Sequence, residues 1–265
     1  MLNKLLAPIL ESLPENNQME RIWVLAKNDF RKRFYGTSIG IVWALINPLI
    51  QLIVYYLVFT YVIKRRTENF ALYLFSGLLL WLFFSEATKK GISVLQSKRY
   101  LIENIKLNKF DLFTSSLLSV ILTLVFNFFV YFLLSIAFSI EYSIYALLFP
   151  FLVLNMCIIA FSFSLFLSVI NIYLRDISHL WDIVLLVGFW GNPIIWNYKI
   201  LADKFPLAVS LNPIGGIIVN MRETVLYAHP PVWEYFIIDW LMAFVFLWIS
   251  ITVFKKYSHK AAEML

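Results

Sequence analysis

The stretch KNDFRKRFYGTSIGIVWALINPLIQLIVYYLVFTY, residues 27 to 61, joins a charged segment directly to a long apolar one. The apolar part is long enough for a helix that crosses about 30 Å of hydrocarbon, since an α-helix rises about 1.5 Å per residue. It also carries polar and aromatic side chains that a lipid-facing anchor does not need: Trp43, Asn47, Gln51, Tyr55, Tyr56, Thr60 and Tyr61. We therefore expect something other than lipid to contact this helix.

The composition of the 265-residue chain is that of a membrane protein. Hydrophobic residues make up 61% and charged residues 14%, whereas soluble domains have about half and about a quarter. Six runs are long and apolar enough to span a membrane: 37–63, 70–87, 112–140, 145–173, 177–196 and 232–254. Lipid offers the backbone no hydrogen-bond partners, so such runs are helical. The predicted fold class is an all-α polytopic membrane protein with six transmembrane helices.

Lys and Arg fall unevenly on the connections between these runs. Most of the 22 lie on one side, in the amino-terminal segment, the second and fourth connections, and the carboxyl-terminal tail; the others are Lys64, Arg65, Arg66, Lys199, Lys204 and Arg222. By the positive-inside rule both termini are cytoplasmic, with residues 1–36 and 255–265 flanking a transmembrane domain at 37–254. The net charge of +6 suits anionic headgroups of membrane lipids, and nothing indicates nucleic acid as a partner.

A first cytoplasmic segment, residues 18 to 35, has the pattern of an amphipathic helix. Ile22, Leu25, Ala26 and Phe30 recur at helical spacing, and charged residues lie mostly on the other face. The pattern predicts a helix that lies in the plane of the membrane interface. Two roles stay open: an anchor held by anionic lipid, or a docking surface for a partner or an anionic lipid-linked substrate.

A second cytoplasmic segment, SKRYLIENIKLNKF at residues 97 to 110, is long enough for a short helix. Leu101, Ile102, Ile105 and Leu107 are expected to be exposed among its charged residues, which a solvated loop would not need. A short amphipathic helix of this kind inserts into a groove of a soluble partner. The alternative is packing against the membrane surface.

Residues 197 to 231, on the outer side, are too interrupted by Pro, Gly and charged residues to cross the membrane. The apolar stretch LAVSLNPIGGIIVNM within them predicts two half-helices that meet at Asn212 and Pro213. A re-entrant hairpin is tolerated only where protein or a water-filled path covers its backbone. It is either an outer gate or an interfacial hairpin without a gating role.

Several chemistries have no support in the sequence. The eight glycines form no GxxxxGK[ST] phosphate loop, so the chain does not bind ATP by that mechanism. The three histidines lie on separate connections or ends and show no metal-ligand spacing, so no metal site is expected. Glu86, Asp182 and Asp239 lie near the ends of predicted spans, whereas ion-coupled carriers place ionisable residues near the midplane. Energy for transport must then come from elsewhere, or none is used.

Aromatic side chains are abundant, with 25 Phe, 14 Tyr and nine Trp, and many lie in the middle of spans. Rings with polar edges suit a conduit for sugars, which present apolar C–H faces and hydroxyl rims. Most of these rings are nevertheless expected to pack against lipid or within the core.

Four stretches carry a family resemblance: RFYGTSIGIVWALINPLIQLIVYYLVF (33–59), NIYLRDISHLWDIV (171–184), NPIIW (192–196) and LNPIGGIIVNMRETVL (211–226). In this order and on these spans, the chain resembles the membrane subunits of ABC-2-type exporters that move lipid-linked polysaccharides such as O-antigen or teichoic acid. The resemblance covers about residues 20 to 257. It implies a homodimer in the bacterial cytoplasmic (inner) membrane, whose paired bundles form a channel above two ATP-binding cassette subunits.

On the same resemblance, this chain is a transport subunit and no enzyme, and ATP and Mg²⁺ are bound by the partner subunits, with no cofactor in this chain. Residues 18–35 would form an interface helix, residues 97–110 a coupling helix to the ATPase, and residues 202–224 the outer gate helices. The first and fifth spans would line the channel. The candidate channel aromatics are Trp43, Tyr55, Tyr56, Phe59, Phe189, Trp190 and Trp196.

Two groups of charged residues receive roles in this interpretation. Arg31, Lys32 and Arg33 are expected to attract the pyrophosphate-lipid end of the substrate, because clustered cations at the headgroup level bind anions. Arg175 and Asp176 are expected to form a structural pair in the turn after the fourth span. The rival functions are an ABC-2 exporter of another lipid or a drug, and an integral-membrane lipid-linked transferase. The transferase would need clustered acids, histidines or a metal site.

Overall fold

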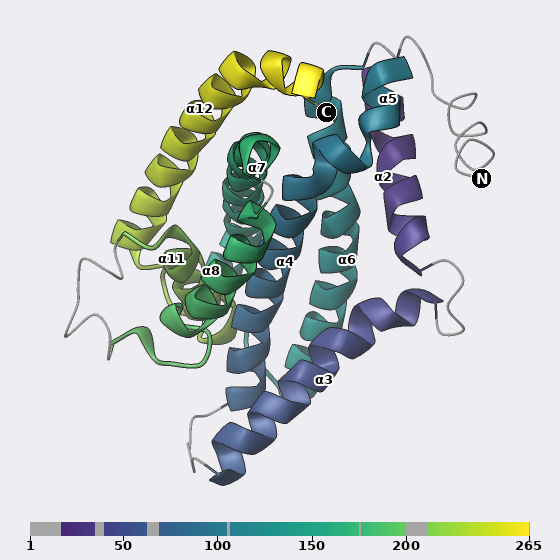
Figure 1. Cartoon of the computed structure of the whole chain (residues 1–265). Coiled ribbons are helices and arrows are strands. Elements are labelled where there is room, and N and C mark those ends of the chain that lie inside the picture. The colour runs from purple at the N-terminus through teal and green to yellow at the C-terminus, as the bar shows by residue number, and fades with distance from the viewer. Residues whose placement is uncertain are drawn as a thin grey trace.

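The computed structural model describes residues 17–34, 40–62, 69–104, 107–174, 176–199 and 211–264. Every regular element within these ranges is a helix (Figure 1). The α-helices are α2 (Gln18–Phe34), α3 (Trp43–Leu57), α4 (Phe70–Ser97), α5 (Arg99–Asn104), α6 (Lys109–Ala137), α7 (Phe149–Tyr173), α8 (Ile177–Gly191), α11 (Pro213–Met221) and α12 (Trp233–Met264). Short 3-10 turns at Gly40–Val42 (η1) and Ile144–Leu148 (η3) and π-helical turns at Val58–Val62 (η2) and Arg222–Leu226 (η4) extend them.

Five helical segments of the described ranges are long and apolar enough to cross a membrane: Trp43–Val62, Phe70–Ser97, Lys109–Ala137, Ile144–Tyr173 and Trp233–Ser258. The prediction of an all-helical, multi-pass protein is confirmed. The remaining predicted span, 177–196, holds α8 of only 15 residues, about 22 Å long. The helix ends because Pro193 has no backbone N–H and restricts the preceding residue, Asn192, to an extended conformation.

α4 lies at the centre of the bundle, between α6 and α7 (Figure 1). Of its most apolar stretch, 78% of the residues are buried, against 17% for the corresponding stretches of α3 and α12. Close packing of α4 on α7 requires a glycine at position 91, because a β-carbon there would lie 2.7 Å from the Cα of Ser164. Ser164 Oγ in turn donates to the carbonyl oxygen of Ala87, at 3.1 Å. The core of the protein therefore centres on one helix.

Only one face of α3 packs against the other described residues of the chain. Ala44, Pro48 and Leu52 are buried at a spacing of four residues, the period at which side chains share a helix face. Ile50 and Ile53 lie on other faces and are about half exposed. An apolar face this large is left available to lipid or to another chain.

α2 runs beside the first half of α6 and in the same direction (Figure 1). Arg21 pairs with Asp111 at 2.7 Å, and twelve residues further along both helices Arg33 donates to Thr123 Oγ1 at 3.4 Å. The predicted amphipathic helix is present as α2, while its place in the plane of the membrane interface stays a prediction. Its apolar residues, such as Leu25, are buried against the protein itself.

One end of the bundle gathers three segments that are distant in sequence. The first turn of α2, the helix α5 and the end of α12 lie together there (Figure 1), and Lys109 Nζ donates to the carbonyl oxygen of Ser258 at 2.6 Å. We refer to this as the α5 end, and to the opposite end, where α4 begins, as the Tyr73 end. The shared location agrees with the predicted grouping of the basic connections, while the side that faces the cytoplasm stays a prediction.

Candidate functional site

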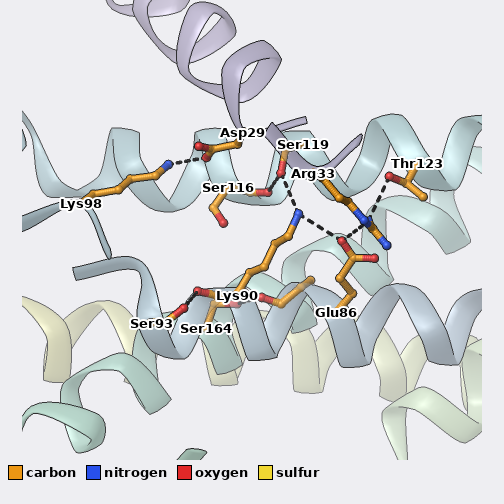
Figure 2. A network of polar contacts seen from close by, with 11 residues as sticks. Asp29, Arg33, Glu86, Lys90, Ser93, Lys98, Ser116, Ser119, Thr123 and Ser164 are labelled. Carbon is orange, nitrogen blue, oxygen red and sulfur yellow. Dashed lines mark hydrogen bonds and ion pairs between the residues drawn. The ribbon is translucent and has the colours of Figure 1, made fainter. Parts of the chain in front are cut away.

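A network of charged and hydroxyl groups lies between α2, α4 and α6 (Figure 2). Glu86 of α4 pairs with Lys90 at 3.1 Å and with Arg33 of α2. Lys90 Nζ also donates to Ser119 Oγ at 3.4 Å. The network lies where charged residues follow the apolar stretch of α4. α2 therefore packs against a polar surface of α4 and α6.

Lys98, just beyond the end of α4, forms the second part of the network (Figure 2). Its ammonium group lies 2.6 Å from Asp29 Oδ2 and 3.1 Å from Ser115 Oγ, and its side chain is 11% exposed. Burial lowers the pKa of Lys98, and the attraction of Asp29 partly opposes that shift. The pair thus ties α2 to both α4 and α6 at the cost of desolvating a cation.

Two hollows that share Arg33 and Lys90 open into this network. The first, of about 310 Å³, lies between α3, α4 and α6. Two buried atoms of its wall, Ser85 Oγ and Asn127 Oδ1, have no hydrogen-bond partner among the described residues. Buried polar atoms are normally satisfied, so water or a ligand is expected there.

The second hollow, of about 340 Å³, is lined by four cations, one acid and three serines: Lys32, Arg33, Lys90, Lys98, Asp29, Ser93, Ser97 and Ser116. An excess of cations over acids in a concave site attracts anions. Lys and Arg donors together with serine hydroxyls are also the groups that bind phosphate oxygens. The hollow is therefore a candidate anion site.

The three cations of α2 that the sequence groups together have different surroundings in the structure. Arg33 belongs to the network and to both hollows, and Lys32 lines the second one. Arg31 is exposed and lines neither hollow. Sequence reasoning also missed Lys90 and Lys98, which lie in a different connection of the chain and come together with α2 only through its packing on α6.

α5 presents a different surface from the predicted one. Leu101 is buried, at 6% exposure, in a cluster with Leu25, Leu112 and Phe254. Ile102 and Leu107 are partly buried against the same cluster, and Ile105 lies outside the described residues. The prediction that these apolar side chains are exposed to a partner is therefore wrong for Leu101, because α2, α6 and α12 already cover it. The exposed residues of α5 are Arg99, Glu103 and Asn104.

Most of the predicted channel aromatics take part in two groups of ring contacts. Tyr55 stacks on Phe189 at 5.5 Å between ring centroids, and Phe59 meets Trp196 edge-on at 6.1 Å. Trp190 lies edge-on to Phe189, and Tyr56 stacks on Phe70 of α4. Phe59 and Phe189 are buried, whereas Trp190 and Trp196 are almost half exposed. Trp43, at the other end of α3, has no ring contact with the described residues.

Beyond these ring contacts, Arg222 of η4 forms a buried junction that the sequence did not reveal. Its guanidinium donates to the carbonyl oxygens of Tyr73 at 3.1 Å, of Ile194 at 2.7 Å and of Pro193, and lies 3.5 Å above the Tyr73 ring. The charge distribution assigns Arg222 to a connection between spans, although the apolar stretch IIVNMRETVL around it indicates burial. Arg222 ties α4 to the turn after α8.

The predicted break at Asn212 and Pro213 starts α11. Asn212 Oδ1 accepts from the backbone N–H of Gly215 at 3.1 Å, and Pro213 occupies the first helical position, where no N–H is needed. Asn212 Nδ2 donates to Asn192 Oδ1 at 3.0 Å, which joins α11 to the end of α8. Residues 202–210, the other predicted half-helix, lie outside the described residues, as does Arg175, so its pairing with Asp176 stays a prediction.

Asp239 of α12, which the sequence places near the end of a predicted span, is a buried acid. Its side chain is 1% exposed, and neither carboxyl oxygen has a hydrogen-bond partner among the described residues. It packs against Gly216 of α11, where a β-carbon would lie 2.7 Å from Asp239 Cγ. Within the described ranges no group of three His, Cys, Asp or Glu side chains is arranged to hold a metal ion.

Comparison with known proteins points to one family. A profile described as ABC-2 type transporter matches residues 20–226. The chain is 25% identical over 244 residues to the "O-antigen export system permease protein RfbA" of Myxococcus xanthus, with 91% of this chain and 94% of that protein covered. It is 25% identical over 250 residues to the protein of the same name in Klebsiella pneumoniae, with 91% and 93% covered.

Proposed function

This chain belongs to the ABC-2 type transporter family, and we propose that it is the channel-forming subunit of an exporter of lipid-linked polysaccharide. The family consists of membrane subunits of ABC transporters, which move substrates and are not themselves enzymes. ATP-binding partner subunits supply the energy. The observation that carries the glycan assignment is the similarity to O-antigen export permeases, which extends over 91% of the chain.

The two hollows beneath α2 support a loading site for the anionic end of such a substrate. Lys32, Arg33, Lys90 and Lys98 converge there from α2 and α4. A diphosphate-linked lipid carries its negative charges at the headgroup level, where clustered cations bind them. In this proposal the α5 end faces the cytoplasm and both termini are cytoplasmic.

A channel wide enough for a glycan needs more surface than one chain provides. The exposed apolar faces of α3 and α8 are suited to a second copy, since only 17% of the most apolar stretch of α3 is buried. Two ring contacts join the same two helices and their extensions: Tyr55 of α3 stacks on Phe189 of α8, and Phe59 of η2 meets Trp196 of the turn after α8. We assign these aromatic residues to the channel wall of a homodimer, with α8 as the short fifth span.

α5 and α11 take the remaining roles. α5 is the coupling helix in this proposal, and it meets the ATPase through its exposed polar residues Arg99, Glu103 and Asn104. α11, held at its start by the Asn212–Asn192 hydrogen bond, is the described half of the outer gate. Its attachment to the end of α8 supports a gate beside the channel wall.

Export of a glycan by the assembled complex is the test. Cells that make the lipid-linked glycan but lack this chain are complemented with wild type, with Tyr55→Ala and Tyr56→Ala combined, or with both tyrosines changed to Phe. We expect surface glycan with wild type and the Phe pair, and a loss with the Ala pair, because the rings contact the substrate. Wild-type surface glycan in cells without this chain would refute the proposal, and export of another lipid in its place would favour a different ABC-2 substrate.

A further inference from the structure

A third pocket lies at the Tyr73 end of the bundle, on the opposite side from the cationic hollows. It has a volume of about 220 Å³ and is formed by the first turn of α4, the segment after α8, and η4 with the residues that follow it. Lys98 and Tyr73 lie at opposite ends of the same helix, about 37 Å apart at 1.5 Å per residue. The pocket is therefore separate from the loading site of the proposed function.

Three tyrosines from three segments line this pocket: Tyr73, Tyr198 and Tyr227. Each makes a further contact that fixes its ring. Tyr73 donates its hydroxyl to the carbonyl oxygen of Trp196 at 2.6 Å. Tyr198 meets Tyr235 edge-on at 6.2 Å, and Tyr227 stacks on His229 at 6.1 Å. Because the contacts fix their orientation, the rings form a preorganised aromatic wall.

Polar groups complete the rim of the pocket. Glu223 Oε2 pairs with His229 Nδ1 at 3.1 Å, and since a carboxylate accepts at two oxygens, acceptor capacity remains. Asn197 Oδ1 accepts from the backbone N–H of Lys199 at 3.0 Å, which leaves the amide NH₂ group and the exposed ammonium of Lys199 as donors. The rim thus offers both donors and acceptors.

The charges of this pocket differ from those of the cationic hollows. Lys199 and Glu223 balance each other, and the guanidinium of Arg222 is occupied by three backbone carbonyl oxygens. A phosphate group would find Lys199 as the exposed cation here, beside the carboxylate of Glu223, whereas four cations line the second hollow. Aromatic faces beside mixed donors and acceptors instead match a pyranose, which has an apolar C–H face and a rim of hydroxyl groups.

We propose that this pocket is a saccharide-binding subsite, which holds sugar units of the glycan at the outer mouth of the protein. The inference rests on the proposed function for the source of the sugar. Tyr198 is the ring we assign to stacking, because it is only partly buried and its segment carries Asn197 and Lys199 beside it.

Photo-crosslinking in exporting cells tests the subsite directly. p-Benzoylphenylalanine replaces Tyr198, or Tyr142 as a control, in the complete exporter. Tyr142 is also exposed and lies between α6 and η3, at the same end of the bundle but outside the pocket. We expect adducts with a ladder of glycan lengths from position 198 and none from position 142. Equal ladders at both positions, phospholipid adducts alone at position 198, or no adduct there would overturn the proposal.

Matched substitutions provide the second measurement. Tyr198→Phe keeps the ring, whereas Tyr198→Ala removes it, and Tyr235→Ala removes only its neighbour. The rate of glycan export is expected to fall by about threefold or more in Tyr198→Ala, the effect of losing one stacked ring, and to stay near wild type in Tyr198→Phe. Wild-type export in Tyr198→Ala would overturn the subsite and leave the proposed function intact. Absence of glycan export by the wild-type complex would instead refute the proposed function.

Discussion

Arg222 occupies the space that a side chain at position 77 would need. A β-carbon on Gly77 would lie 2.6 Å from Nη2 of Arg222 and 3.3 Å from the Cα of Ile194. The guanidinium is 3% exposed and is satisfied by backbone carbonyl oxygens of α4 and of the turn after α8. A buried cation is tolerated because charge-assisted hydrogen bonds replace its hydration. Three segments at the Tyr73 end of the bundle thus meet at one residue.

Gly77→Ala is expected to lower the melting temperature of the detergent-solubilised protein. The added methyl group overlaps the guanidinium, and overpacking in a core costs about 1–3 kcal/mol. Gly191→Ala is the control, since a β-carbon there would meet nothing within 4 Å. An equal melting temperature for Gly77→Ala and wild type would show that Arg222 shifts without loss.

Arg222→Met should destabilise the protein more than Gly77→Ala does. The substitution keeps an unbranched side chain but removes the guanidinium donor from the buried carbonyl oxygens of Pro193 and Ile194, at about 1–3 kcal/mol for each unsatisfied group, whereas the carbonyl oxygen of Tyr73 still accepts from Ser76 Oγ. Arg222→Lys keeps the charge without the planar fork, so an intermediate melting temperature is expected. If Arg222→Met melts like wild type, the junction does not hold α4 to the turn after α8.

Sequence pattern predicted the existence of the helices better than it predicted what covers them. The amphipathic spacing of Ile22, Leu25 and Ala26 gave the right helix for α2, but periodicity reports only that one face is buried. Periodicity does not tell whether lipid, a partner or the same chain covers that face. In this protein α2 packs against α6. The predicted exposure of Leu101 was wrong for the same reason, because the side chains that bury it belong to segments distant in sequence.

The candidate site was predicted only where its residues are neighbours in sequence. Arg33 and the aromatics of α3 stand out in a continuous stretch, and the structure places them in the network and among the ring contacts. Lys98 has no local signal that separates a buried cation from an exposed one, and Arg222 has only the apolar stretch around it. Their partners, Asp29 and the carbonyl oxygens of residues 193 and 194, become neighbours only through helix packing.

The exposed face of α5 gives a prediction for ATPase binding. Glu103→Lys reverses an exposed charge whose one ion pair within the described part of the chain is with Arg99, four residues earlier, at 2.5 Å, so the fold should tolerate it. We expect less ATPase subunit to co-purify with this variant while its melting temperature stays unchanged. Leu101→Asp should instead lower the melting temperature, because Leu101 is buried. Undiminished co-purification with Glu103→Lys would move the docking surface away from α5.

The pair of Lys98 and Asp29 predicts a pH-dependent effect on stability. Burial lowers the pKa of Lys98 from its usual 10.5, and Asp29 opposes that shift. In Asp29→Asn the attraction of the Asp29 carboxylate is lost, so the pKa of Lys98 falls further. Between the lowered pKa and 10.5 the unfolded chain binds more protons than the folded one, so stability rises with pH across this window. We expect Asp29→Asn to melt below wild type at neutral pH, and the difference to narrow toward pH 10.

The control for that pair is Asp182→Asn. Asp182 pairs with Lys89 at 2.6 Å, but both side chains are more than half exposed, and exposed ion pairs contribute little. Its melting temperature should equal that of wild type at every pH. A difference between Asp29→Asn and wild type that does not change with pH would mean that Lys98 stays charged in both.

Substitution of Asp239 tests whether ATP hydrolysis alone drives export or whether coupled proton movement also contributes. A buried, unpaired carboxyl group in a membrane span is expensive and is commonly a site of proton transfer. If the ATPase alone supplies the energy, Asp239→Asn should export glycan at the wild-type rate, and its melting temperature should not fall, because the amide has the same shape and carries no charge. Gly216→Ala, which pushes a methyl group against the same carboxyl, should lower the melting temperature and serves as the structural control. Loss of export in Asp239→Asn, with ATPase binding and melting temperature unchanged, would show that proton movement through α12 contributes to the transport cycle.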